Sequence, residues 1–138
     1  METTTAERFI HTLEHAERTG DVGPLAALFS DDAELSNLVQ LEPQRGREGA
    51  REFWHRYLSA FRHVHSRFTH VIEADNTVVL EWVAEGVLPS GTPLNYRGVS
   101  VLEERDGQLR RFRTYYDTAA FVPTGAKGRA RSLAEDVS

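Results

Sequence analysis

Glu81 raises the clearest question of chemistry in this chain. It lies in VVLEWVAEG, a run of β-forming residues, and it shares the parity of Val79 and Val83. If that face borders water, the carboxylate is a solvated surface group. If it lines a cavity, desolvation disfavours the charged form, which is how proteins make a general base. Alternation alone favours the first orientation, with Leu80 and Trp82 in the core.

Asn37 and several aromatic residues are further candidates for contact with a ligand. The Asn37 amide can donate to a developing enolate or carbonyl oxygen, and the alternative is a strand-end residue bonded to the local backbone. A tyrosine hydroxyl that enters an apolar cavity must find a partner, so it can orient a ligand, and the alternative is simple packing. The aromatic candidates for ligand binding are Trp54, Tyr57, Tyr96, Phe112 and Tyr116.

Composition excludes several classes of protein. The 138 residues fit one domain, and 40% hydrophobic with 27% charged residues is ordinary for a soluble globular protein. A net charge of −5 argues against nucleic acid as a partner, and the absence of cysteine excludes disulfides and thiolate chemistry. No long apolar run indicates a membrane span or a signal peptide, so we expect a cytoplasmic protein.

Metal binding has one superficial signal. HTLEH, His11 to His15, matches a zinc-peptidase pattern, but both histidines lie opposite Phe9 and Leu13, on the water side of the predicted helix. We therefore expect no metal, and nothing in the sequence indicates a cofactor.

The hydrophobic period changes half-way along the chain. Helical spacing predicts helices at 3–18, from Pro24 through LAALF, and at 50–61, with a short strand at 33–38. The second half predicts strands at 66–74, 77–87, 94–104 and 109–119, joined by short turns that make neighbours antiparallel. We expect an α+β fold in which three N-terminal helices pack on one curved antiparallel sheet. The domain spans residues 1–122, and a flexible tail follows at 123–138.

Three segments in this order carry a resemblance to a known family: ERTGDVGPLAALFSDDAEL, RGREGAREFWHRYL and RDGQLRRFRTYYDTAAF. From about Thr5 to Val122 the chain resembles the SnoaL-like branch of the nuclear transport factor 2-like superfamily. The resemblance implies a cone-shaped α+β barrel around an apolar cavity, with dimers formed through the outer sheet face. The superfamily includes ketosteroid isomerases, epoxide hydrolases, polyketide cyclases and pure binding or scaffold domains, so the fold alone assigns no activity.

The family's known catalytic groups are missing at the matching positions. Against the ketosteroid isomerases, Asn37 replaces the enolising base, Leu13 the tyrosine and Ser100 the second acid. Against the epoxide hydrolases, the arginine position falls on Glu81, and one aspartate position falls on Thr114.

The resemblance also implies that both sheet faces are covered. Glu81 then faces the cavity, whereas Leu80 and Trp82 join Val99 and Val101 on a dimer face. Asp117, in the family's RTYYDTAAF segment, faces outward by alternation, and a bulge before it would turn it inward.

Two functions follow from this sequence. One is a SnoaL-like protein that binds a small hydrophobic ligand and carries out cofactor-independent acid/base chemistry of the cyclase, isomerase or hydratase type. Its catalytic candidates are Glu81, Asn37 and Asp117. The alternative is a non-catalytic binding domain or a dimeric scaffold.

Overall fold

The computed structural model describes residues 3–39 and 42–121, so the predicted tail lies outside the described residues. The helices are α1 (Thr5–Thr19), α2 (Gly23–Ala26) and α3 (Gly46–Ser59), followed late in the chain by the short 3-10 helix η1 (Thr118–Phe121). The strands are β1 (Phe29–Asn37), β2 (Gln44–Arg45), β3 (His63–Ala74), β4 (Thr77–Val87), β5 (Pro93–Arg105) and β6 (Gln108–Tyr116). None of the described helices is long and apolar enough to cross a membrane.

Local sequence signals define both ends of α1. The Thr4 hydroxyl accepts a hydrogen bond from the Glu7 amide at 3.1 Å, and Gly20 ends the helix at φ 79°, a conformation that costs a glycine little. The Ala6 amide donates to Glu73 Oε1 at 3.0 Å, which ties the beginning of the helix to β3. The buried stripe of α1 thereby faces the sheet along its whole length.

The six strands form one sheet in the order β2-β1-β6-β5-β4-β3. Strands β3 to β6 pair antiparallel, as predicted, but β1 runs parallel to β6. The predicted all-antiparallel sheet is therefore wrong at this one pairing. A parallel pair needs a long crossover connection, and α3 with the strands after it supplies that connection. The two-residue strand β2, expected as loop, pairs with β1.

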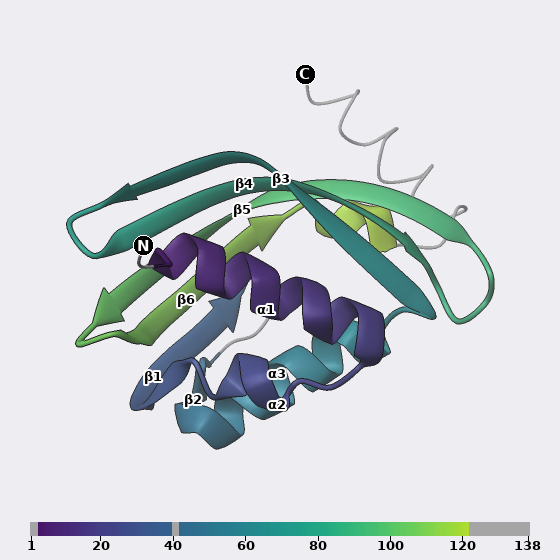
Figure 1. Cartoon of the computed structure of the whole chain (residues 1–138). Coiled ribbons are helices and arrows are strands. Elements are labelled where there is room, and N and C mark those ends of the chain that lie inside the picture. The colour runs from purple at the N-terminus through teal and green to yellow at the C-terminus, as the bar shows by residue number, and fades with distance from the viewer. Residues whose placement is uncertain (1–2, 40–41, 122–138) are drawn as a thin grey trace.

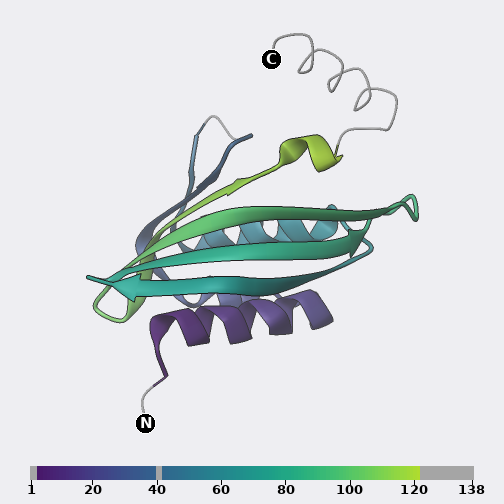
Figure 2. The ribbon, with the colours of Figure 1, turned by 90° about the horizontal axis from the view of Figure 1, so that it is seen from above.

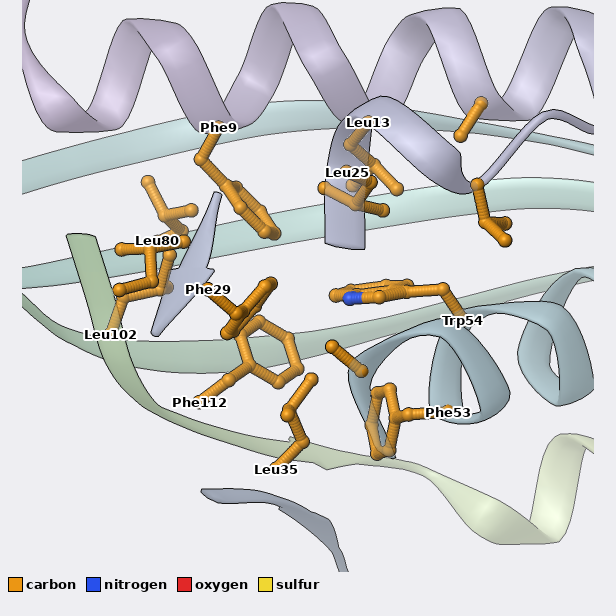
Figure 3. Packing of buried hydrophobic residues seen from close by; sticks show 14 of the residues in the cluster. Phe9, Leu13, Leu25, Phe29, Leu35, Phe53, Trp54, Leu80, Leu102 and Phe112 are labelled. Atoms are coloured by element: carbon orange, nitrogen blue, oxygen red, sulfur yellow. The ribbon is translucent and has the colours of Figure 1, made fainter. Parts of the chain in front are cut away.

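The sheet curves over the helices. In Figure 1 the long strands β3, β4 and β5 arch above α1, with α2 and α3 below, and Figure 2, seen from above, shows α3 behind these strands and α1 alongside them. The core fills the concave side. Figure 3 shows Phe9 and Leu13 reaching in from α1, Trp54 from α3 and Phe112 from the sheet. This is the curved α+β architecture expected from the sequence, with its helices around a single core.

Strand β4 alternates strictly between the two faces of the sheet. Even-numbered Leu80 and Trp82 are buried, at 0% and 6% exposed, whereas Glu81 is exposed. Pairing with β5 sets Leu80 opposite Ser100 and Glu81 opposite Val99. Directly opposed residues share a face, so the predicted grouping of Leu80 and Trp82 with Val99 on a dimer face is wrong.

Candidate functional site

A small cavity of about 40 Å³ lies in the core between the concave face of the sheet and helices α1 and α3. The helices line it with Phe9, Leu13, Phe53, Trp54 and Tyr57. The strands line it with Asn37, Ser66, Phe68, Trp82, Ser100, Phe112, Thr114 and Tyr116. The wall is therefore mostly aromatic, with a few hydroxyl and amide groups.

A wider groove of about 410 Å³ adjoins this cavity. The two share Asn37, Phe53, Tyr57 and Tyr116 in their walls. Phe121 of η1 also lines the groove, where its ring packs 4.9 Å from that of Tyr96. The shared residues make a continuous site with a narrow inner part and an open outer part.

The structure places Glu81 on the outer face of the sheet, away from the cavity. Its side chain is 55% exposed, and its Oε1 lies 2.8 Å from His70 Nδ1 and 3.2 Å from Thr69 Oγ1. The prediction that Glu81 faces a dry interior is wrong, because the even-numbered residues of β4 face the core and alternation turns Glu81 to the outer face. A carboxylate in this position is a solvated surface group.

The other two catalytic candidates occupy different places. Asn37 lines both the cavity and the groove, and its Oδ1 accepts a hydrogen bond from the Val39 amide at 2.9 Å. Asp117 is exposed, and its Oδ1 accepts from the Ala119 amide at 3.0 Å within η1. Asp117 thus caps η1, whereas Asn37 stays a candidate for contact with a ligand.

Trp54 is the most informative of the predicted ligand-binding residues. It is 4% exposed, and its ring packs against Phe9, Phe53, Tyr57 and Phe112. Figure 3 shows the indole reaching from α3 into the core. Among the described residues, Trp54 Nε1 is the buried side-chain nitrogen or oxygen that lacks a hydrogen-bond partner. An unpaired buried donor costs about 1–3 kcal/mol.

Two tyrosine hydroxyls, one from α3 and one from β5, meet beside the cavity. Tyr57 and Tyr96 share a short hydrogen bond between their hydroxyl groups, and only Tyr57 lines the cavity. Burial raises the pKa of both hydroxyls and also that of Tyr116. These phenols therefore remain protonated at neutral pH and are poor bases.

Trp82, which was expected on a dimer face, belongs to the cavity wall. Its Nε1 donates to Ser100 Oγ at 3.0 Å, and Ser100 Oγ lies 2.9 Å from Thr114 Oγ1. Its cross-strand partner is Gly98, where an added Cβ would lie 2.7 Å from the indole ring. Glycine at this position provides room for the ring, and a tryptophan opposite a glycine is the sequence signal that would have placed Trp82 inside.

Glu17 of α1 is a site residue that the sequence analysis missed. Its carboxylate accepts hydrogen bonds from Ser66 N at 3.1 Å and from Ser66 Oγ at 2.6 Å, and Ser66 lines the cavity. Burial raises its pKa, although the bonds from Ser66 oppose that shift. The signal was a glutamate one helical turn after Leu13, at the partly buried edge of the apolar stripe of the helix.

In the described part of the chain, no group of three histidine or acidic side chains could hold a metal ion.

Comparison with known proteins places the chain in a family, since the family model described as the SnoaL-like domain matches residues 6–112. The chain belongs to the SnoaL-like domain family. No curated protein matches it in sequence.

Solved structures with the same fold are distant in sequence from this SnoaL-like chain. A hypothetical protein with a ketosteroid isomerase-like fold from Catenulispora acidiphila, in complex with trimethylamine, is 22% identical over 85% of this chain and 90% of its own, with a TM-score of 0.74. TerC, co-crystallized with polyporic acid, is 20% identical over 83% of this chain and 95% of its own, with a TM-score of 0.69. A putative SnoaL-like polyketide cyclase from Jannaschia sp. CCS1 is 16% identical over 88% of this chain and 94% of its own, with a TM-score of 0.68. These likenesses show the nuclear transport factor 2-like fold.

The SnoaL-like resemblance predicted correctly which residues line the cavity at four positions, although it was wrong about Glu81. Leu13, Asn37 and Ser100, which match the isomerase catalytic positions, all line the cavity, as does Thr114. None of the four carries an acid or a base. The cavity thus keeps the family's position but not the isomerases' catalytic groups.

Proposed function

We propose that this SnoaL-like domain binds a small, largely apolar molecule that carries one hydrogen-bond acceptor. The acceptor receives the hydrogen bond of Trp54 Nε1, the buried donor that lacks a partner within the described part of the protein. A ligand oxygen at this position removes the penalty of the unpaired group, whereas a pure hydrocarbon leaves it. Trp54 is thus the observation that carries the proposal.

The size of the site limits how such a ligand lies. Pockets for drug-sized ligands usually measure about 300–1,000 Å³, far more than the inner cavity. The polar end of a small molecule occupies the inner cavity of about 40 Å³, and any larger remainder extends past Tyr57 and Tyr116 into the groove of about 410 Å³. Asn37, Phe112 and the tyrosines are then contact residues.

Binding is supported over acid/base catalysis by the chemistry of the wall. None of the described residues that line the cavity is a carboxylate, an imidazole or a cation, and the raised pKa of Tyr57 leaves its phenol a poor base. Two proteins of the same fold were crystallised with a small molecule, trimethylamine in one and polyporic acid in the other. Non-catalytic binding therefore fits the site better than proton transfer by Glu81.

Indole N–H resonances test the proposal directly, because the chain has two tryptophans. Titration with cyclohexanone should move the Trp54 Nε1–H signal downfield, since the ketone oxygen accepts its proton. Trp82 Nε1 already donates to Ser100, so its signal is the internal control. Methylenecyclohexane has the same shape without the oxygen and should not cause the downfield shift. A Trp54→Phe variant assigns the two signals, and unchanged spectra with both compounds would refute the proposal.

We also propose a homodimer through the outer face of β4 and β5, with a corrected set of residues. Val79 lies opposite Val101, and Val99 and Val83 share that face. All four are only partly buried, and Tyr115 of β6 is 45% exposed beside them. Glu81, Arg97 and Arg113 stand among these side chains on the same face, and a second copy would cover the apolar ones. Sedimentation of the full chain at micromolar concentration should give a dimer, and a monomer would contradict it.

A further inference from the structure

Glu17 is a charged group held just behind the wall of the cavity. It lies on the inner side of α1, and both of its carboxylate oxygens accept hydrogen bonds from Ser66. The Ser66 hydroxyl at 2.6 Å belongs to a residue that lines the cavity. One hydrogen bond therefore separates this carboxylate from the space where a ligand binds.

The charge of Glu17 has little compensation in the described part of the protein. None of the ion pairs formed there includes it. The neighbour that favours its charged form is His65, an exposed residue of β3 that carries a charge only when it is protonated, and Glu14 acts in the opposite direction. Its negative charge also contributes to the raised pKa of Tyr57, whose ring lines both cavity and groove. Glu17 therefore contributes negative potential to the inner cavity, whereas Arg56, which is paired with Glu52, lines the outer groove.

The wall itself favours positive charge. Aromatic faces attract cations through the negative potential above the ring, and the attraction is strongest where water is excluded. The described cavity wall has aromatic rings from Trp54, Tyr57, Phe68, Trp82 and Tyr116, among others, and no lysine, arginine or histidine. An anion could accept the hydrogen bond of Trp54 Nε1 but would be repelled by the ring faces and by Glu17, whereas a compact organic cation meets rings and a nearby carboxylate.

We propose that the ligand of this site is a small organic cation, an amine or quaternary ammonium, that carries an oxygen a few bonds from the nitrogen. The nitrogen lies against the aromatic wall on the side of Ser66, where the Glu17 carboxylate balances its charge. The oxygen accepts the hydrogen bond of Trp54 Nε1. This inference rests on the proposed function, because it names the class of molecule that binds in that same cavity.

A pair of probes with the same shape isolates the effect of charge. Choline and 3,3-dimethylbutan-1-ol differ in that a quaternary nitrogen replaces a quaternary carbon, and both have a hydroxyl oxygen. Calorimetric titration of the full chain should show choline binding at least about tenfold more tightly than the neutral alcohol. Equal affinities, or tighter binding of the alcohol, would overturn the inference.

Variants assign the preference to Glu17. Glu17→Gln should reduce the choline preference to near unity and leave the affinity for the neutral alcohol unchanged. Glu14→Gln removes the same charge one turn earlier on α1, from a residue that does not bond to the cavity wall, and should keep the preference. If Glu17→Gln does not fold, the comparison of the two probes on the natural chain still decides whether the ligand is a cation.

The cyclohexanone titration separates the two proposals. If cyclohexanone shifts the Trp54 signal but choline does not bind, the cavity takes neutral acceptors and only the cation inference is wrong. If neither cyclohexanone, choline nor the alcohol binds, the proposed function itself fails. If choline binds and Glu14→Gln weakens it as much as Glu17→Gln does, the effect is that of net charge and the role of Glu17 is refuted.

Discussion

The two faces of β4 carry opposite kinds of residue at neighbouring positions. On the concave face, Trp82 is 6% exposed, hydrogen-bonded to Ser100 and part of the cavity wall. On the outer face, Glu81 is in water beside His70. The difference teaches that simple alternation of apolar and polar residues gave the orientation correctly. The family resemblance, which implied that Glu81 faces the cavity and that Leu80 and Trp82 face a partner, assigned both faces the wrong way round.

The largest expected effect contrasts these two neighbours. Trp82→Ala should destabilise the protein by about 3–5 kcal/mol, because it empties a buried site between the sheet and the helices. Glu81→Ala removes an exposed ion pair and should cost less than about 1 kcal/mol. Urea denaturation measures both. Equal losses would mean that the outer face is as well packed as the concave one.

Gly98, opposite Trp82, gives the next largest effect. An alanine Cβ there would lie 2.4 Å from the Tyr115 carbonyl oxygen and 2.7 Å from the Trp82 ring. Backbone atoms cannot move aside cheaply, so Gly98→Ala should cost about 1–3 kcal/mol. Arg97→Ala, the neighbouring exposed residue, should change stability by less than about 0.5 kcal/mol. Thermal denaturation of the pair tests this, and a neutral Gly98→Ala would refute the close packing.

The outer face gives a third contrast, which depends on the proposed dimer. Val101→Glu adds a charge at the apolar part of that face and repels its copy on the other subunit. The dimer dissociation constant should rise at least about tenfold, which corresponds to about 1.4 kcal/mol. Val71→Glu, a change on the exposed edge strand β3, is the control and should leave dissociation unchanged. Similar weakening by both would place the interface elsewhere.

The smallest expected effect is the pH dependence that Glu17 adds to stability. Its folded pKa is raised above the ordinary value of 4.5 because burial disfavours the carboxylate. The folded state therefore holds this proton more tightly than the unfolded one. Its contribution is fully present below about pH 4.5 and is lost as the pH rises through the folded pKa.

Glu17→Gln cannot lose that proton. The stability of the variant relative to the natural chain should therefore improve from pH 4 to pH 7.5, by less than about 1 kcal/mol because bonds to Ser66 also change. Urea titrations of both proteins at the two pH values measure the difference. A relative stability that falls with rising pH would contradict the raised pKa.

The fold was largely predictable from sequence because its signals are local. Helical periodicity and the Gly20 stop placed α1, and turns such as Asp75 with Asn76, at φ 51° and 62°, joined strands β3 and β4 in a tight hairpin. The parallel pairing of β1 with β6 was not predicted. Nothing local encodes it, since strand order between segments distant in sequence depends on how the whole sheet closes over the core.

The site was predicted less well than the fold. The aromatic candidates Trp54, Tyr57 and Phe112 do line the cavity, but the predicted carboxylate, Glu81, lies on the outer face of β4, and Glu17 was not among the candidates. A glutamate within a buried helical stripe looks like a tolerated irregularity until its partner, Ser66, is brought to it by the fold. The missing hydrogen bond of Trp54 Nε1 cannot be predicted from sequence either, because it depends on whether any residue that the fold brings near the indole offers an acceptor.

The parallel ladder between β1 and β6 has a consequence for synthesis. Leu35 of β1 pairs with Phe112 of β6, so the edge of β1 that bonds to β6 stays unpaired until almost all of the described chain has left the ribosome. Until then α1 can form, but its apolar stripe has no complete sheet to cover. Pairing between segments that are distant in sequence slows folding and leaves aggregation-prone intermediates with exposed apolar surface. We expect a nascent chain that stops before β6 to engage chaperones strongly, and one that includes it to be released.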